Sequence, residues 1–173
     1  LNGTREGLFN SLQALCPETK NGFQSIVLIP NPFYQVYAVA ALSSNVKPIY
    51  INATKENKFL PDFSGVSKSI LDKTAVVYVC SPSNPQGSIA SESYWADLLK
   101  LAEKFNFRIF ADECYSEIYR SEPPPGILEV ARKIKANPER IVSFHSLSKR
   151  SNVAGLRSGF VASGPKNIKA LKR

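Results

Sequence analysis

Short apolar runs alternate along the chain with segments of helical periodicity, and this alternation limits the fold more than any other feature. The runs have the length of buried β-strands and occupy residues 25–30, 47–51, 74–80, 108–112, 140–145 and 157–163. Between them, apolar side chains three or four positions apart predict helices over residues 5–16, 34–42, 62–71, 91–105, 127–136 and from 165 onward. Apolar strands separated by helices indicate a mainly parallel sheet in a three-layer αβα sandwich.

Two of the predicted helices begin at residues that commonly cap a helix. Asp62 opens the segment 62–71 and Ser91 opens the segment 91–105. A side-chain oxygen at this position accepts a hydrogen bond from an N–H group of the first turn. We therefore expect both residues to act as caps.

The length and composition exclude several classes of protein. With 173 residues the chain corresponds to about one domain, and 43% apolar with 21% charged residues is typical of a folded one. No apolar run approaches the roughly 20 residues of a membrane span, so no membrane partner is expected. The first ten residues also lack the pattern of a signal peptide.

Cysteine and histidine usage argues against a metal site. The three cysteines form no C-x-x-C pair, and there is one histidine. Neither a disulfide framework nor a zinc ribbon is expected, and a reducing, cytoplasmic compartment fits.

The chain carries a formal net charge of +8, which raises nucleic acid as a partner. The lysines and arginines form no stripe interleaved with aromatic residues, so we expect no nucleic-acid partner. A basic nucleic-acid-binding domain would explain the charge, but it would explain none of the motifs below. It would also require binding to a duplex that weakens steeply with salt.

Polar residues collect directly after four of the predicted strands, in residues 31–34, 81–87, 112–115 and 146–149. Ligands of open α/β sheets bind at the carboxyl ends of the strands, so we expect the site there. Asp112 either caps the following turn or provides a counter-charge for a ligand cation, because an unpaired buried charge is costly. Lys149 is either a solvated lysine or, near a second cation such as Arg157, an amine nucleophile.

Two further segments carry weaker signals. Asn84-Pro85-Gln86-Gly87 is typical of a turn, and its Asn–Pro bond is a candidate cis peptide. Gly3-Thr4-Arg5 precedes a predicted helix, where free backbone N–H groups can bind an anion or simply start the helix.

Taken together, four motifs resemble the large domain of the class I/II, fold-type-I pyridoxal-phosphate-dependent aminotransferases. They are NPFYQVY (31–37), SPSNPQG (81–87), ADECYSEIY (111–119) and SLSKRSNVAGLRSGF (146–160), and their order and spacing match across nearly the whole chain. The opening NGTREGLF is similar to bacterial N-succinyl-diaminopimelate aminotransferases.

The resemblance implies how the chain relates to the family's fold. Residues 1–173 correspond to the central part of the cofactor-binding large domain, with the strand 157–163 antiparallel to its neighbour. The N-terminal arm, the first strand of the sheet and the C-terminal small domain are absent from the chain. One edge of the sheet is therefore expected to be exposed.

The resemblance also implies pyridoxal 5′-phosphate as the cofactor. Lys149 would attach the cofactor covalently and move the substrate proton, and Asp112 would keep the pyridine nitrogen protonated. Tyr115 and Asn84 would hydrogen-bond the ring 3-oxygen, and Tyr34 would stack on the ring. The phosphate would be bound by Gly3, Thr4, Arg5, Ser146, Ser148 and Arg157, with the backbone N–H sufficient in the case of Arg5.

The implied activity is ping-pong transfer of an amino group between an amino acid and an α-keto acid, in a homodimer. We expect this chain by itself to bind the cofactor with little or no turnover. One alternative is a lyase or synthase that uses the same cofactor and fold. Another is a non-catalytic, aminotransferase-like ligand-binding domain of a bacterial regulator.

Several polar residues near the motifs have a structural explanation. We expect His145 to be a strand residue, Cys114 a packing residue, and Tyr37 and Tyr119 core or dimer-surface aromatics. Glu113 is a candidate to support a site residue from behind.

Overall fold

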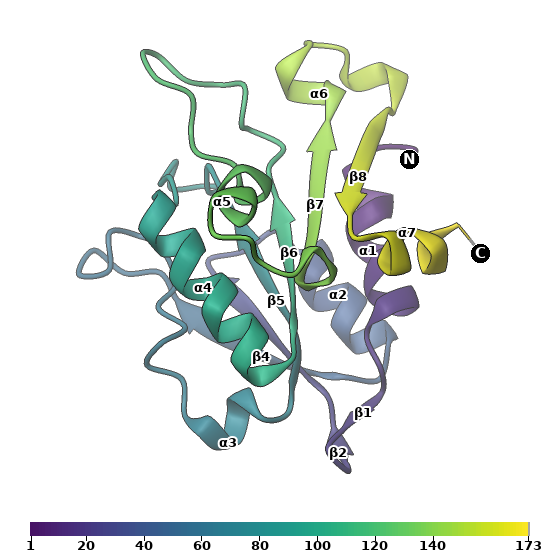
Figure 1. The fold of residues 1–173 in the computed structure, drawn as a ribbon. Helices are drawn as coiled ribbons and strands as arrows, with labels where there is room; N and C mark the ends of the chain where they lie inside the picture. Colours follow the sequence, from purple (N-terminus) through teal and green to yellow (C-terminus); the bar gives the residue numbers. More distant parts are fainter. Residues whose placement is uncertain (173) are drawn as a thin grey trace.

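The computed structural model describes residues 1–172 and contains a six-stranded sheet in the order β4-β3-β5-β6-β7-β8 (Figure 1). The strands are β3 Ile26–Asn31, β4 Lys47–Asn52, β5 Thr74–Cys80, β6 Arg108–Asp112, β7 Ile141–Ser146 and β8 Gly159–Ser163. Neighbouring strands are parallel except β7 and β8, which pair antiparallel. The predicted mainly parallel sheet with one antiparallel strand is confirmed, and β8 forms one of its two edges.

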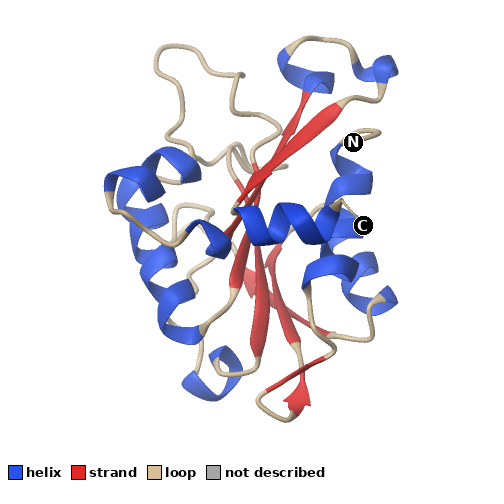
Figure 2. Ribbon diagram, turned by 45° about the vertical axis from the view of Figure 1, so that its right-hand side comes forward, coloured by secondary structure: helices blue, strands red, loops and turns tan. Residues whose placement is uncertain are grey.

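Helices cover both faces of the sheet, which gives the three layers seen in Figure 2. One face carries α1 Thr4–Leu15, α2 Val36–Ser43 and α7 Pro165–Leu171. The other carries α3 Lys68–Leu71, α4 Glu92–Phe105 and α5 Ile127–Lys133. The structure also contains three further short helices within residues 1–172: the 3-10 helices η1 Pro138–Arg140 and η2 Ala154–Leu156, and the α-helix α6 Leu147–Arg150. Within residues 1–172, no helix has both the length and the apolar character needed to cross a bilayer.

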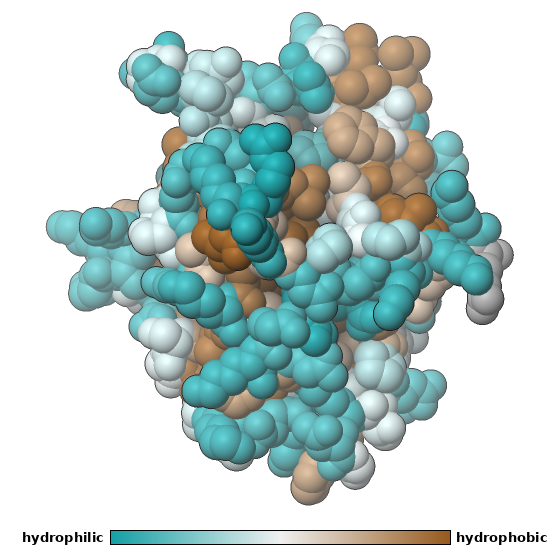
Figure 3. All heavy atoms as spheres, in the orientation of Figure 1, coloured by the Kyte–Doolittle hydropathy of each residue, from teal (hydrophilic) through white to brown (hydrophobic). Residues whose placement is uncertain are grey.

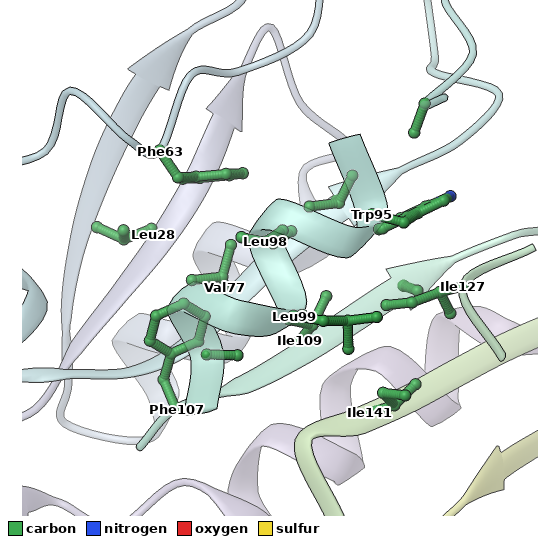
Figure 4. Packing of buried hydrophobic residues seen from close by; sticks show 14 of the residues in the cluster. Leu28, Phe63, Val77, Trp95, Leu98, Leu99, Phe107, Ile109, Ile127 and Ile141 are labelled. Atoms are coloured by element: carbon green, nitrogen blue, oxygen red, sulfur yellow. The ribbon is translucent and has the colours of Figure 1, made fainter. Parts of the chain in front are cut away.

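Each face of the sheet has its own hydrophobic core, because strand side chains alternate between the faces. Figure 4 shows the core beneath α4, where Trp95 and Leu99 lie with Ile109 and Ile127. The indole N–H of Trp95 donates to the carbonyl of Pro125 at 3.1 Å, so its one polar group is satisfied. The two cores hold the strands, and therefore the strand ends, in fixed register.

One apolar surface is left uncovered near the antiparallel edge. Figure 3 shows apolar atoms gathered at the upper right, over the segment that runs from α6 into β8. Leu156 is 71% exposed and Phe160 is 46% exposed in this segment. Exposed apolar patches on soluble domains commonly mark contacts with another protein.

The predicted helix over 62–71 is wrong for most of its length, since only Lys68–Leu71 is helical. Asp62 caps no helix. Its carboxylate accepts hydrogen bonds from the Ser64 N–H at 2.9 Å and from the Ser64 hydroxyl at 2.6 Å. This local turn satisfies the side chain that a helix would have used, and it lets Phe63 reach the core. Ser91, in contrast, caps α4 as predicted by accepting from the Tyr94 N–H at 3.1 Å.

Two elements end earlier or begin later than predicted because of left-handed backbone conformations. Arg157 has φ 49° and closes the η2 turn, so β8 begins at Gly159. The helix predicted over 127–136 stops at Lys133, and Lys135 has φ 55°. The Asn84–Pro85 peptide bond is cis, as predicted.

A two-stranded hairpin was not predicted. It joins β1 Thr19–Lys20 to β2 Phe23–Gln24 through Asn21 and Gly22, which have φ values of 53° and 79°. Asn-Gly is the strongest short hairpin signal, so the sequence does contain the information. The two strands were missed because two residues are too few to show the alternation of apolar and polar side chains that indicates a strand.

Candidate active site

A cavity of about 600 Å³ opens where the strands of the parallel sheet end. Ten of the eleven predicted site residues line it: Thr4, Arg5, Tyr34, Asn84, Asp112, Tyr115, Ser146, Ser148, Lys149 and Arg157. Cys80, Cys114 and Ala154 also line it and were not predicted as site residues. The eleventh predicted residue, Gly3, lies directly behind Arg157.

The sheet topology explains why residues from distant motifs meet. β5, β6 and β7 are adjacent and parallel, so their carboxyl ends lie side by side. The pairing places Cys80 opposite Asp112 and Asp112 opposite Phe144, two residues before Ser146. α6 follows β7 without a gap and carries Ser148 and Lys149 into the same space. The residues that follow the strands thus line one cavity, which is where the sequence predicts the site.

Asp112 is a buried carboxyl that lines the cavity, 5% exposed. Its Oδ2 accepts a hydrogen bond of 2.6 Å from the hydroxyl of Tyr37. Its Oδ1 accepts a long one of 3.4 Å from the Cys114 N–H, which caps the following turn. Burial raises the pKa of Asp112 above its ordinary value, and the hydrogen bonds from Cys114 and Tyr37 oppose that rise. A cationic ligand group beside this carboxyl would complete its stabilisation.

Tyr37 contacts the cavity-lining Asp112, although the sequence did not single it out as a site residue. It is fully buried at the start of α2, stacked on Tyr78 with ring centroids 4.4 Å apart. The expectation of a core aromatic is therefore correct, yet its hydroxyl is the strongest hydrogen-bond donor to Asp112. The sequence feature that could have indicated this contact is the position of Tyr37 in the same motif as Tyr34, three residues later. Tyr119, in contrast, is 46% exposed.

Two pairs of predicted site residues contact each other directly. The Asn84 side-chain amide lies 3.4 Å from the hydroxyl of Tyr115, so both groups can address one ligand oxygen. The Arg5 guanidinium donates to the hydroxyl of Tyr34 and lies 5.5 Å from the centroid of its ring. The side chain of Arg5 therefore fixes the ring of Tyr34.

The remaining residues surround one end of the cavity. Ser146 is buried, and its hydroxyl accepts from the Ser148 N–H at 3.1 Å. Arg157 is held by a hydrogen bond of 3.0 Å to the Ala154 carbonyl. Gly3 precedes α1 with φ 86°, and a Cβ built there would lie 2.3 Å from Nη2 of Arg157. Among residues 1–172 no side chain caps α1, so the first N–H groups of this helix are free to bind an anion.

The charge balance of the cavity favours an anionic ligand. Its lining includes three cationic side chains, Arg5, Lys149 and Arg157, and one carboxyl, Asp112. The thiol of Cys114 contacts the hydroxyl of Thr4 at 3.1 Å, and burial raises its pKa far above the ordinary value. It is therefore a packing residue as predicted, because a thiol of this kind is a poor nucleophile.

Comparison with known proteins identifies the family. The model of the aminotransferase class I and II family matches residues 1–173. The chain is 34% identical over 149 residues to the LL-diaminopimelate aminotransferase of Dehalococcoides mccartyi, covering 86% of this chain and 37% of that protein. It is 34% identical over 146 residues to the LL-diaminopimelate aminotransferase of Aquifex aeolicus, covering 84% and 36%.

Solved structures of aminotransferases have the same fold as this chain. The fold matches an aminotransferase from Neisseria meningitidis with a TM-score of 0.91 and 38% identity, covering all of this chain and 44% of that one. It matches a probable N-succinyldiaminopimelate aminotransferase from Thermus thermophilus with a TM-score of 0.88 and 28% identity, again covering 100% and 44%. The chain belongs to the class I and II aminotransferase family. It spans well under half the length of these relatives.

Members of this family depend on pyridoxal 5′-phosphate, and the cavity has the chemistry to hold it. The cofactor presents an aldehyde, a pyridine nitrogen, a ring face and a phosphate. The cavity presents an amine, a buried carboxyl, an aromatic ring and two cationic groups beside free N–H groups. Because Gly3 has no Cβ, the Arg157 guanidinium can lie against the backbone at the start of α1, in a place where any larger residue would overlap it.

We predict that Tyr37→Phe destabilises the protein more at pH 7 than at pH 4. The folded-state pKa of Asp112 is raised, so stability falls as pH rises from the unfolded-state pKa to the folded-state one. Removal of the Tyr37 hydroxyl raises the folded-state pKa further, which widens this loss. We expect a cost of about 1–3 kcal/mol at pH 7, as for a buried acceptor that loses its donor, and a smaller cost at pH 4.

Urea unfolding at the two pH values measures the difference. Tyr78→Phe is the matched control, since Tyr78 lies in the same stack but donates to the Leu8 carbonyl at 2.9 Å. Its cost should be the same at both pH values. A cost of Tyr37→Phe that does not change with pH would contradict the account of Asp112.

Proposed function

We propose that residues 1–173 are the central part of the cofactor-binding large domain of a pyridoxal-phosphate-dependent aminotransferase. The observation that carries the proposal is the convergence of Lys149, Asp112, Tyr34 and Arg157 on one cavity from four separate motifs. When bound, the cofactor supplies a ring that delocalises negative charge developing on the substrate Cα. The chain's own residues bind the ring, orient it and move protons.

Lys149 and Asp112 would hold different groups of the cofactor. Lys149 would supply the amine that attaches it, and the same amine would be the base that moves a proton at the substrate Cα. Asp112, held by Tyr37, would accept a hydrogen bond from the protonated pyridine nitrogen. The new cationic partner offsets the burial that raises the pKa of this carboxyl.

The other residues orient the cofactor. Tyr34, fixed in place by Arg5, would stack on the ring. Asn84 and Tyr115 would hydrogen-bond the ring 3-oxygen from their adjacent positions. The phosphate is bound by Arg157, the hydroxyls of Thr4, Ser146 and Ser148, and the free N–H groups that follow Gly3.

The substrates we propose are an amino acid and an α-keto acid, with a diaminopimelate derivative as the amino donor. Two relatives are named LL-diaminopimelate aminotransferases, and one matched structure is titled a probable N-succinyldiaminopimelate aminotransferase. We propose a homodimer, which the exposed apolar side chains Leu42 and Leu156 support. The free thiols support a cytoplasmic location.

Amino transfer has a direct test on the full-length protein. The protein loaded with pyridoxal phosphate is mixed with N-succinyl-diaminopimelate or LL-diaminopimelate, without any keto acid. We expect one equivalent of pyridoxamine phosphate and one of the keto product, and none from Lys149→Ala. Release of ammonia with the cofactor unchanged would contradict the proposal and indicate a lyase.

We predict that Gly3→Ala weakens binding of pyridoxal phosphate by at least about tenfold, because the new methyl group displaces Arg157 from the phosphate. Binding of pyridoxal, which lacks the phosphate, should change far less. Gly22→Ala is the matched control: Gly22 also has a positive φ, 79°, but no atom lies within 4 Å of a Cβ built there. Equal losses for pyridoxal and pyridoxal phosphate in Gly3→Ala would contradict the phosphate site.

A further inference from the structure

Glu113 is a buried residue whose carboxyl lies outside the cavity. The function proposed above assigns no role to it. It is 3% exposed and follows Asp112 directly. The two side chains point to opposite faces of the sheet, because Asp112 contacts α2 while Glu113 contacts α5. A buried carboxyl is costly unless it is fully hydrogen-bonded, so its contacts show what it holds in place.

Three hydrogen bonds tie Glu113 to two different elements. Its Oε1 accepts from the Ile127 N–H at 3.0 Å, at the start of α5. Its Oε2 accepts from the Ser143 hydroxyl on β7. Its own N–H donates to the Phe144 carbonyl at 3.0 Å, also on β7. Burial raises the pKa of Glu113, while the donors Ser143 and Ile127 oppose that rise.

The contacts continue through Ser143 to His145. The Ser143 oxygen lies 2.8 Å from Nε2 of His145, which is itself 3.5 Å from Oε2 of Glu113. An ionised Glu113 can only accept, so the single hydroxyl proton of Ser143 points to it. The Ser143 oxygen then accepts from the Nε2–H of His145. His145 stacks on Phe160 and immediately precedes Ser146 of the cavity.

Glu113 thereby closes the long loop that carries Tyr115. This loop runs from residue 114 to 126, between β6 and α5, and Figure 1 shows it as an extended excursion at the top of the molecule. Its first residue follows the Glu113 backbone, and its end is bound to the Glu113 carboxylate through Ile127. Both ends of the loop are therefore fixed at one residue, which is itself fixed to β7.

We propose that Glu113 is a positioning residue of the cofactor site. By joining the ends of the loop to β7, it sets the positions of Asp112 and Tyr115 relative to Ser146. The consequence for the cofactor rests on the function proposed above, whereas the hydrogen-bond chain to His145 is a property of the protein alone.

The test uses two variants, Glu113→Gln and Ser143→Ala, each with a matched control. Glu113→Gln keeps an acceptor for Ile127 but cannot accept from Ser143 at the amide nitrogen, and Ser143→Ala removes the link to His145. Glu122→Gln changes an exposed residue of the same loop. Ser25→Ala changes a buried serine whose hydroxyl has no partner among residues 1–172.

Without cofactor, the readout is the NMR signal of the imidazole of His145. His145 is the one histidine of residues 1–173, and in the full-length protein its signal is assigned as the one that His145→Gln removes. We expect it to move in Glu113→Gln and in Ser143→Ala, and to stay unchanged in both controls. An unchanged signal in the two variants would overturn the hydrogen-bond chain.

With pyridoxal phosphate, the readouts are its dissociation constant and the pH midpoint of the visible band of the bound cofactor. We expect the dissociation constant to rise about three- to tenfold in both variants, as for one weakened hydrogen bond to a charged group. The midpoint should move to higher pH, because a less well placed Tyr115 stabilises the deprotonated ring oxygen less. Loss of fold alone would lower the bound fraction without moving the midpoint.

The outcomes separate the two proposals. If the unmodified protein binds pyridoxal phosphate and both variants match it in affinity and midpoint, Glu113 is not a positioning residue. If the unmodified full-length protein does not bind pyridoxal phosphate, the proposed function fails and this inference fails with it.

Discussion

The carboxyl ends of the parallel strands meet at one edge of the sheet, and this arrangement brings the cavity residues together. β5, β6 and β7 are adjacent and parallel, so Cys80, Asp112 and Ser146 lie close together although the chain separates them. Two hydrophobic cores fix this register from both faces. A slip of one residue would move Asp112 to the other face, where Glu113 now lies, and the cavity would lose its carboxyl.

Different hydrogen-bond partners give the two neighbouring buried carboxyls different roles. Asp112 has one strong donor, Tyr37, and lines the cavity, so it is free to bind a cationic ligand group. Glu113 is satisfied by Ile127 and Ser143 and serves the structure of the surrounding loop. Environment rather than residue type thus separates a group that addresses a ligand from one that holds the backbone.

The sequence predicted the sheet well, because strands buried on both faces are read from apolar runs alone. It predicted the cavity well too, since Asp112, Asn84 and Lys149 follow such runs or belong to specific motifs. It failed at 62–71, where a turn at Asp62 competes with the helix, and at Tyr37, whose role depends on a contact across 75 residues. Neither effect is visible in local periodicity.

Lys149 is proposed to be the amine that holds the cofactor in this cavity. Borohydride reduction of the protein with pyridoxal phosphate, followed by peptide mapping, tests this role. We predict that the pyridoxyl group is found on Lys149 alone, and that Lys149→Ala shows neither the label nor a visible absorbance band. A label spread over several surface lysines, or an unchanged band in Lys149→Ala, would contradict the account.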